Sequence, residues 1–464
     1  MRSICVKLSH VIHPPIFSHT KTKMLQCNQR HLPILLLISA GLLSGCQTFN
    51  GLFPAQQRAV NTNLPIETPV VAQHEYPLSP KQAMVGNLAT VNSREGDALS
   101  DIARHFGLGY TDISIANPSI APWTPKAGSQ VVLPVQFILP EAQHKGIVLN
   151  LATMRLFYYP KKQNSVTTYP VSIGREGWGT PMGLTRVAVK TANPEWHVPD
   201  SIYREHAQKG DILPHVVRSG PNNPLGYYAM RLALPRYLIH GTNKPYGIGM
   251  QVSHGCIQMY PEDIEVLFED VAVGTQVHIV HQPYLAAWHD NSLYMEAHDP
   301  VAQAAGNKNR KQKEFLGTLK KMAKQHHAKV DWDKVKQALK RADGIPTPVL
   351  VGSPDINTLT RSATAVNHPG TLYGQPVVAP LKANDWSILV DTFKDETAAQ
   401  RMVAMLNHQG PSIPARKIQK GADYEVIAGP FSDKKQANAF AKRIRYEFEI
   451  DVKPIAPVLM SSNP

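Results

Sequence analysis

Residues 238–241 read Leu-Ile-His-Gly and residues 252–257 read Val-Ser-His-Gly-Cys-Ile, so His240 precedes Cys256 by 16 positions (256 minus 240). A thiol acts as a nucleophile in its thiolate form, and a nearby imidazole that accepts its proton supplies that form near neutral pH. Each of the two residues follows a short apolar run, which is typical of a β-strand ending at a cleft. The stretch therefore predicts a thiol and an imidazole at neighbouring strand ends.

Glycines surround this pair. Gly255 leaves backbone N–H groups accessible, as an oxyanion hole requires, and three further glycines at 241, 247 and 249 keep the connecting segment tight. Two other interpretations stay open: a buried structural cysteine, and a zinc site formed by His240, His254 and Cys256. Zinc is disfavoured because the segment offers no fourth Cys or His ligand. We expect no metal and no cofactor.

The run Ser-His-Gly-Cys plus an apolar residue, about fifteen positions after a histidine, resembles the signature of the L,D-transpeptidase catalytic (YkuD) domain. The resemblance implies that Cys256 is the acylated nucleophile and His240 its base. It also implies that the Gly241 carbonyl orients the imidazole. The residues that would shape the oxyanion hole are Ser253, His254 and Gly255. The chain departs from the family pattern at Gln258, where Arg or Asn is usual, and this position is a candidate substrate contact.

The resemblance extends over residues 144–282, which read as predominantly β with Gly- and Pro-rich turns. It implies a YkuD-type β-sandwich. A short helix is expected at 262–268, begun by a proline. Tyr246, on the loop that joins the two site residues, and Trp196 are candidates for lining the substrate cleft, although Trp196 equally suits a core position.

With 464 residues the chain is long enough for about three domains, and we expect a multidomain protein. Its net charge of +13 suits anionic partners such as peptidoglycan stem peptides or lipid head groups. A solvated basic face is the alternative, and the charge by itself favours it. Basic residues are not interleaved with aromatic ones as in nucleic-acid-binding motifs, so no nucleic-acid partner is expected.

Residues 24–46 read as a lipoprotein signal. The apolar run at 32–43 is too short to span a bilayer, and it leads into Leu-Ser-Gly-Cys, which resembles a bacterial lipobox ending at Cys46. Cleavage there would leave Cys256 as the only unmodified thiol, with no partner for a disulfide. Because Gln47 replaces the aspartate that retains lipoproteins in the inner membrane, we expect the periplasm of a Gram-negative bacterium and an outer-membrane lipid anchor. An uncleaved or simply secreted signal is the alternative.

Residues 47–88 are rich in polar residues and Pro, which predicts a flexible tether. Residues 89–135 follow with a helix that Asp97 is expected to cap, a second helical segment and a closing strand. This small α/β unit resembles a LysM glycan-binding module. The alternative is a packing subdomain without a carbohydrate site.

Three segments follow the catalytic domain. Residues 283–343 carry apolar residues at helical spacing among many lysines, which predicts two basic amphipathic helices. Residues 344–383 are Pro- and Thr-rich and read as a linker. Residues 384–456 have the order βαββαβ, an α+β unit that resembles the SPOR domain, which binds glycan strands stripped of stem peptides. The first half departs from that family at Leu389 and Asp391, and the alternative is a protein-docking or degenerate module without glycan binding.

Together these resemblances imply a peptidoglycan L,D-transpeptidase that acts on stem peptides and glycan strands. The acceptor is open: another diaminopimelate, giving a 3-3 cross-link, or the lysine of an envelope lipoprotein. If water resolves the intermediate, the same site acts as an L,D-carboxypeptidase or amidase. A non-catalytic peptidoglycan-anchoring protein is the alternative from another class. Papain-like enzymes are disfavoured because their Cys precedes their His, and sortases because the two residues lie much farther apart.

Overall fold

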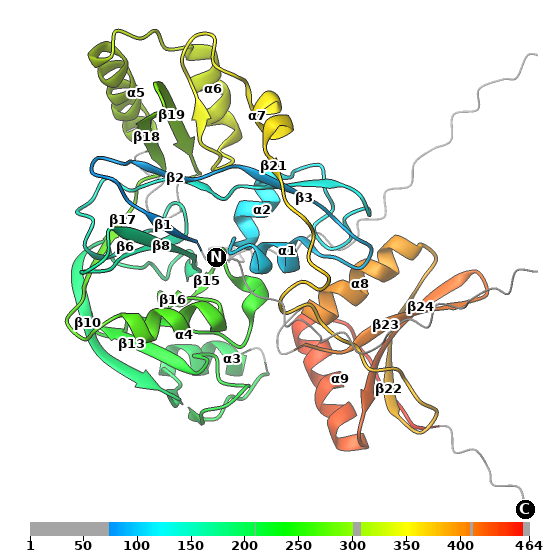
Figure 1. The fold of residues 1–464 in the computed structure, drawn as a ribbon. Coiled ribbons are helices and arrows are strands. Elements are labelled where there is room, and N and C mark those ends of the chain that lie inside the picture. The colour runs from blue at the N-terminus through cyan, green and yellow to red at the C-terminus, as the bar shows by residue number, and fades with distance from the viewer. Residues whose placement is uncertain (1–73, 209, 300–307, 409–411, 458–464) are drawn as a thin grey trace, which may run out of the picture. The chain divides into compact units, whose positions relative to one another are not determined.

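The computed structural model describes residues 74–208, 210–299, 308–408 and 412–457 (Figure 1). The predicted signal, Cys46 and most of the predicted tether lie outside these residues. Across the described ranges, no helix is both long and apolar enough to cross a membrane.

The region expected to be catalytic is built on a nine-stranded sheet in the order β1-β8-β7-β6-β17-β10-β13-β14-β16. In that order the strands are Glu75–Pro77, Ser165–Pro170, Arg155–Tyr159, Gly146–Asn150, Gln276–Val280, Gly183–Ala192, Tyr228–Leu232, Leu238–His240 and Ile257–Gln258. β10 joins two halves, since its first part pairs with β17 and its second part with β13. A register shift between Val187 and Val189 separates the two parts, and such bulges bend a strand.

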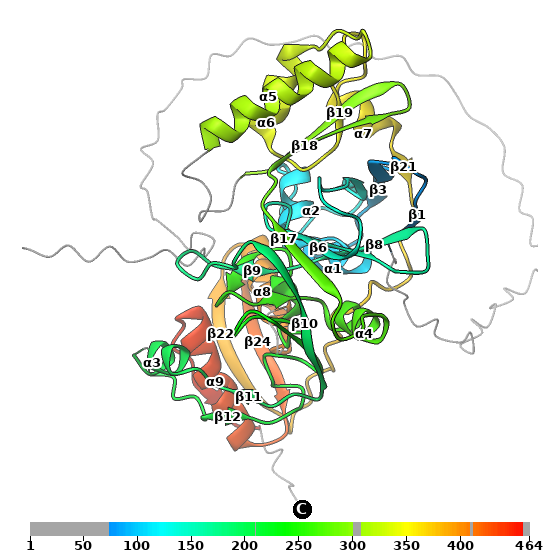
Figure 2. The ribbon, with the colours of Figure 1, turned by 90° about the vertical axis from the view of Figure 1, so that its left-hand side faces the viewer.

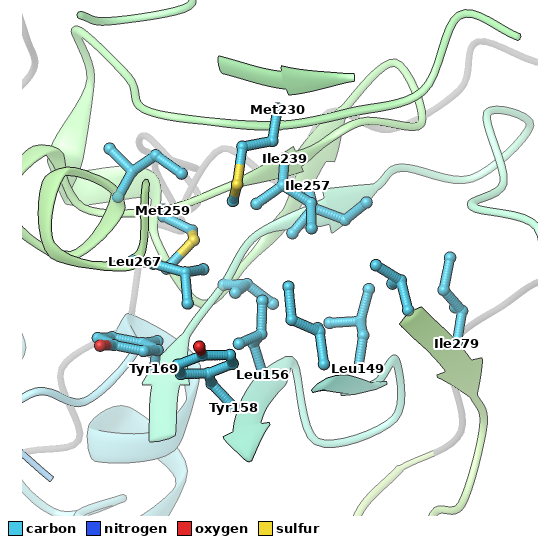
Figure 3. Packing of buried hydrophobic residues seen from close by; sticks show 14 of the residues in the cluster. Leu149, Leu156, Tyr158, Tyr169, Met230, Ile239, Ile257, Met259, Leu267 and Ile279 are labelled. Carbon is cyan, nitrogen blue, oxygen red and sulfur yellow. The ribbon is translucent and has the colours of Figure 1, made fainter. Parts of the chain in front are cut away.

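Both halves of the sheet enclose one hydrophobic core (Figure 3). Leu149 and Leu156 come from β6 and β7, while Ile239 and Ile257 come from β14 and β16, and all four are fully buried. Burial of such side chains contributes about 1.5–3 kcal/mol each. The core therefore fixes the strands that carry the two candidate residues.

Several short elements connect the sheet. The predicted helix is confirmed as α4 (Pro261–Asp270), which starts with proline and buries Ile264 and Leu267. The remaining elements are β9 (Ile173–Gly174), β11 (Trp196–His197), α3 (Asp200–Gln208), β12 (Val216–Val217), the 3₁₀ turn η1 (Pro245–Gly247) and β15 (Gln251–Ser253). β9 pairs in parallel with β15, and β11 pairs with β12.

The segment expected to form a small α/β unit has the order strand, helix, helix, strand. Its elements are β3 (Ala89–Asn92), α1 (Leu99–His105), α2 (Tyr110–Ala116) and β4 (Gln130–Leu133), with β3 antiparallel to β4. The predicted cap is wrong: Ala98 is the N-cap of α1 and makes no side-chain cap bond. Asp97 instead accepts a hydrogen bond from the backbone N–H of Arg94 at 2.6 Å. Its side chain therefore closes the turn that precedes α1.

The described end of the predicted tether is ordered, contrary to the expectation for residues 74–88. β1 pairs with β8 of the large sheet, and β2 (Met84–Gly86) pairs with β5 (Gln136–Ile138). Met84 and Val85 are buried. The polar composition of this segment gave no strand pattern, and the two short strands form by pairing with β8 and β5, which lie far away in the sequence.

A buried arginine links the small α/β unit to the nine-stranded sheet. Arg155 on β7 is 2% exposed and donates to the Asp112 carboxylate on α2 at 3.2 Å and to the Gly107 carbonyl at 3.3 Å. Its guanidinium also lies 4.1 Å from the centre of the Phe137 ring. A buried charge is tolerated when it is paired and hydrogen-bonded in this way.

Arg155→Met is therefore expected to lower the free energy of unfolding by about 3 kcal/mol, because it removes one partner of a buried ion pair. Urea denaturation followed by near-ultraviolet circular dichroism measures the change. Arg186→Met is the matched control, since Arg186 is exposed on β10 and should shift stability by less than about 0.5 kcal/mol. Equal effects of the two substitutions would contradict the assigned role of Arg155.

The basic segment contains the two predicted helices, α5 (Lys308–Gln325) and α6 (Trp332–Arg341). They pack against a hairpin of β18 (Tyr284–His289) and β19 (Ser292–Ala297), which the sequence did not predict (Figure 2). Leu319 and Val335 from the helices meet Leu293 in the core of this unit.

The predicted linker at 344–383 is partly structured, so that expectation is wrong for several of its residues. β20 (Thr347–Pro348) extends the β18–β19 hairpin, α7 (Ile356–Ser362) follows, and β21 (Thr364–Ala365) pairs in parallel with β3. Leu372 is buried in the core of the small α/β unit. Pairing with β3 orders a sequence that has no periodicity of its own.

The C-terminal region has the predicted βαββαβ order. Its elements are β22 (Trp386–Phe393), α8 (Glu396–His408), β23 (Ala415–Lys420), β24 (Asp423–Phe431), α9 (Lys434–Phe448) and β25 (Pro454–Ile455). The sheet order is β23-β24-β22-β25, and α8 and α9 pack against it (Figure 1). The helices and sheet share one core that includes Ile388, Val426 and Ile444.

Candidate active site

The register of two parallel strands places the candidate residues on one face of the sheet. Ile239 lies opposite Ile257, and His240 lies opposite Gln258. Side chains alternate along a strand, and both isoleucines are fully buried in the core. His240 and Gln258 therefore share the opposite face, and the same alternation is expected to place Cys256 there, because it directly precedes β16.

The Cys256 thiol is partly exposed and is free of any disulfide. Its Sγ donates to the Arg236 carbonyl at 3.6 Å. Arg236 has φ of +74°, a left-handed conformation that is uncommon for a residue other than glycine and is often found at functional sites. Burial raises the pKa of the Cys256 thiol, and a hydrogen bond with the backbone of Leu238 lowers it by less.

The His240 ring is buried and oriented by the backbone. Its Nδ1 lies 2.6 Å from the Gly241 carbonyl, as expected from the sequence. A carbonyl only accepts hydrogen bonds, so Nδ1 carries the proton and Nε2 keeps its lone pair in the neutral ring. Burial lowers the pKa of His240 to about 4, although hydrogen bonds with the backbone of Gly241 and Leu225 oppose the effect.

These two pKa directions define the resting protonation state. The pKa of Cys256 lies above the usual value for a thiol, and the pKa of His240 lies well below the usual value for an imidazole. Near pH 7 the resting pair is thus a neutral thiol and a neutral imidazole. The arrangement suits general-base catalysis, in which the imidazole takes the thiol proton as the nucleophile attacks.

Hydrogen bonds brace the turn that precedes the cysteine. Ser253 Oγ donates to the Cys256 carbonyl at 2.5 Å and accepts from the Gly255 N–H at 3.1 Å. Thr180 Oγ1 donates to the Gly255 carbonyl at 2.8 Å. Gly255 has φ of +104°, and a Cβ there would lie 2.9 Å from the Tyr237 ring. Only glycine fits this position without strain.

The small α/β unit supports the loop that joins the two site residues. The Tyr110 N–H donates to the Ile248 carbonyl at 2.8 Å, and a Cβ on Gly249 would lie 2.4 Å from the Gly109 Cα. Nearby, Arg104 of α1 makes a bidentate ion pair with Glu262 of α4, at 2.7 and 2.8 Å. This unit therefore helps to position the loop on which the candidate residues depend.

The other predicted substrate contacts lie in different environments. Gln258 is half-buried, and its backbone exchanges two hydrogen bonds with Ser172. Tyr246 is half-buried in η1, and burial raises its pKa to about 12. Trp196 is half-buried on β11, opposite Val217. Gln258 shares a sheet face with His240, whereas no contact places Tyr246 or Trp196 beside the thiol.

A charged cluster beside the cysteine turn was missed by sequence reasoning. Arg175 Nη2 lies 2.5 Å from Glu205 Oε2 and 2.9 Å from His254 Nε2, and Glu205 Oε2 lies 3.1 Å from the same nitrogen. The Trp178 ring meets His254 edge-on at 4.8 Å. Glu205 comes from α3, 51 positions before Cys256 (256 minus 205), and no motif spacing marks it.

No group of three or more His, Cys, Asp or Glu in the described part of the chain is arranged to hold a metal ion.

Comparisons with known proteins give the chain its family. Residues 144–279 match the family model of the L,D-transpeptidase catalytic domain (YkuD), and residues 382–450 match that of the SPOR domain. The probable L,D-transpeptidase ErfK/SrfK of Escherichia coli K12 is 38% identical over 284 residues, which cover 60% of this chain and 91% of the relative. The probable L,D-transpeptidase YcfS of the same strain is 41% identical over 235 residues, which cover 49% of this chain and 73% of that protein.

A solved structure, the catalytic domain of an E. faecium L,D-transpeptidase, is 21% identical, with a TM-score of 0.23 over 30% of this chain and 99% of that one. The assignment rests on the sequence relatives. The chain belongs to the L,D-transpeptidase family. It is a transpeptidase that carries a C-terminal SPOR domain.

Proposed function

We propose that the protein transfers peptidoglycan stem peptides through a thioester on Cys256. The sheet face that the thiol is expected to share with the oriented His240 imidazole carries this proposal. The matched catalytic domain and the L,D-transpeptidase relatives support the reaction class.

In the first step His240 takes the thiol proton, and sulfur attacks the carbonyl of the diaminopimelate at position 3 of a tetrapeptide stem. The C–S bond forms, the bond to the D-Ala nitrogen breaks, and His240 returns the proton to the departing amine. In the second step an acceptor amine attacks the thioester, an amide forms and the thiol is regenerated.

Charge on the attacked oxygen needs backbone donors in the first step. The Gly255 N–H is engaged by Ser253, so Ser253 and Gly255 act by holding the turn. The N–H of Cys256 itself is the next donor along that turn, and we assign the oxyanion contact to it.

Incubating the purified protein with disaccharide-tetrapeptides tests the transfer. We expect D-Ala and a dimeric muropeptide joined through two diaminopimelates, measured by chromatography and mass spectrometry. Adding a lysine-terminated peptide as competing acceptor distinguishes a 3-3 cross-link from attachment of an envelope protein. Release of D-Ala without any amine-linked product would instead indicate an L,D-carboxypeptidase.

The remaining modules fit a cell-envelope location. We propose that Cys46 carries a lipid anchor in the outer membrane and that residues 89–135 and the SPOR domain hold glycan strands in the periplasm. A Cys46→Ala protein should leave the membrane fraction, and amidase-stripped sacculi should retain more protein than intact ones. Continued sedimentation with membranes at high salt, or equal retention by the two kinds of sacculi, would argue against these assignments.

A further inference from the structure

The Arg175–Glu205 ion pair lies beside the turn that precedes Cys256. The reaction described above does not use this pair. The backbone N–H of Arg175 donates to the Ser253 carbonyl at 2.9 Å, and β9 and β15 pair directly before it. Glu205 approaches from α3. Both side chains remain partly open, with 29% and 26% of their surfaces exposed.

The Arg175 guanidinium has more N–H donors than its two side-chain contacts use. Its two contacts, to Glu205 and His254, both use Nη2, whereas a guanidinium offers five N–H donors. The cation therefore keeps donors for a bound ligand.

The carboxylate of the pair remains ionised at neutral pH. Burial by itself would raise the pKa of Glu205, but hydrogen bonds and charges from Arg175 and His254 outweigh it and lower the pKa to about 2. A partly exposed ion pair contributes little to stability, typically about 0–1 kcal/mol. This small contribution to the free energy of unfolding does not explain why an ion pair lies beside the cysteine turn.

The sign of the two charges selects the ligand. A lone carboxylate would be attracted by Arg175 and repelled by Glu205, and a lone amine would meet the reverse. A group with an ammonium and a carboxylate on one carbon matches both. The side chain of diaminopimelate ends in such a group, a short aliphatic chain away from the carbonyl that Cys256 attacks.

We propose that Arg175 and Glu205 bind the zwitterionic end of the donor diaminopimelate, with its carboxylate on Arg175 and its ammonium on Glu205. This inference rests on the proposed function and adds the determinant of donor specificity. The pair thereby selects stems whose side-chain carboxylate is free over stems in which it is amidated.

Single-turnover acylation of the full-length protein, followed by intact mass, tests the proposal without any acceptor. Two tetrapeptide donors are compared, one with free diaminopimelate and one with its side-chain carboxyl amidated. We expect the wild type to react roughly 10- to 100-fold faster with the free form, the range of a charged hydrogen bond. Arg175→Gln should slow the free donor to the rate of the amidated one, and Glu205→Gln should slow both.

A carbapenem, which lacks this zwitterion, checks the rest of the site in the same variants. Its acylation rate should stay within about 3-fold of wild type. Lys336→Gln, which removes an exposed ion pair with Asp333 far along the chain, is the matched control and should change no rate.

Two results would overturn the inference. If both donors and the carbapenem slow equally, the pair only positions the cysteine turn. If the wild type does not discriminate between the donors, no zwitterion is recognised. Failure of the wild type to be acylated by any donor, with the carbapenem adduct intact, would instead refute the donor assignment in the proposed function, and this inference would fall with it.

Discussion

A Cys256→Ala protein is expected to form no acyl adduct with a carbapenem or a tetrapeptide stem, and its D-Ala release should fall by roughly 10⁴-fold or more. Removing a covalent nucleophile eliminates the pathway and leaves only the catalysis that binding and oxyanion contacts provide. Intact mass measures the adduct, and chromatography measures D-Ala.

Cys46→Ala is the matched control for this result, because it removes a cysteine that our account gives no part in catalysis. It should acylate at the wild-type rate in detergent solution. An adduct that persists in the Cys256→Ala protein would refute the nucleophile assignment, and peptide mapping would show which residue carries it.

His240→Gln is expected to slow acylation by roughly 10²- to 10⁴-fold, the usual contribution of a positioned general base. The pH dependence is the sharper readout. With a pKa of about 4, wild-type His240 is already deprotonated at pH 5 and above, so the acylation rate should be flat from about pH 5 to 8. Below that range it should fall as the ring gains a proton and can no longer act as a base.

A resting thiolate–imidazolium pair predicts a different profile. The reactive form would then be lost as pH falls through the thiol pKa, and rapid thiol alkylation by iodoacetamide would persist at neutral pH. Slow alkylation at pH 7 that speeds up only above the usual thiol pKa is the expected result for the neutral pair, because burial raises the pKa of the Cys256 thiol. His327→Gln, at an exposed position, should leave both profiles unchanged.

The sequence was most informative where local chemistry and periodicity agree. The spacing of His240 and Cys256 predicted the candidate pair, which stays a proposal, and proline before an amphipathic run predicted the helix that is α4. The βαββαβ order of the last domain followed from alternating strand and helix periods. These signals are local, because each depends on residues within one or two turns or strands.

What the sequence did not reveal depends on distant partners. Glu205 reaches His254 only because α3 folds over the cysteine turn, and Arg175 lies beside it only because β9 pairs with β15. β21 pairs with β3, and nothing in a Pro- and Thr-rich segment signals that partner. Asp97 has a good N-cap residue type, yet its side chain closes the turn before the helix.

The most direct measurement traps the acyl-enzyme from a tetrapeptide stem by rapid acid quench and maps it by mass spectrometry. The account predicts a mass gain equal to the donor minus D-Ala, located on the peptide that contains Cys256 and sensitive to hydroxylamine, as a thioester is. An adduct that retains D-Ala, lies on another residue, or never forms during turnover would contradict it.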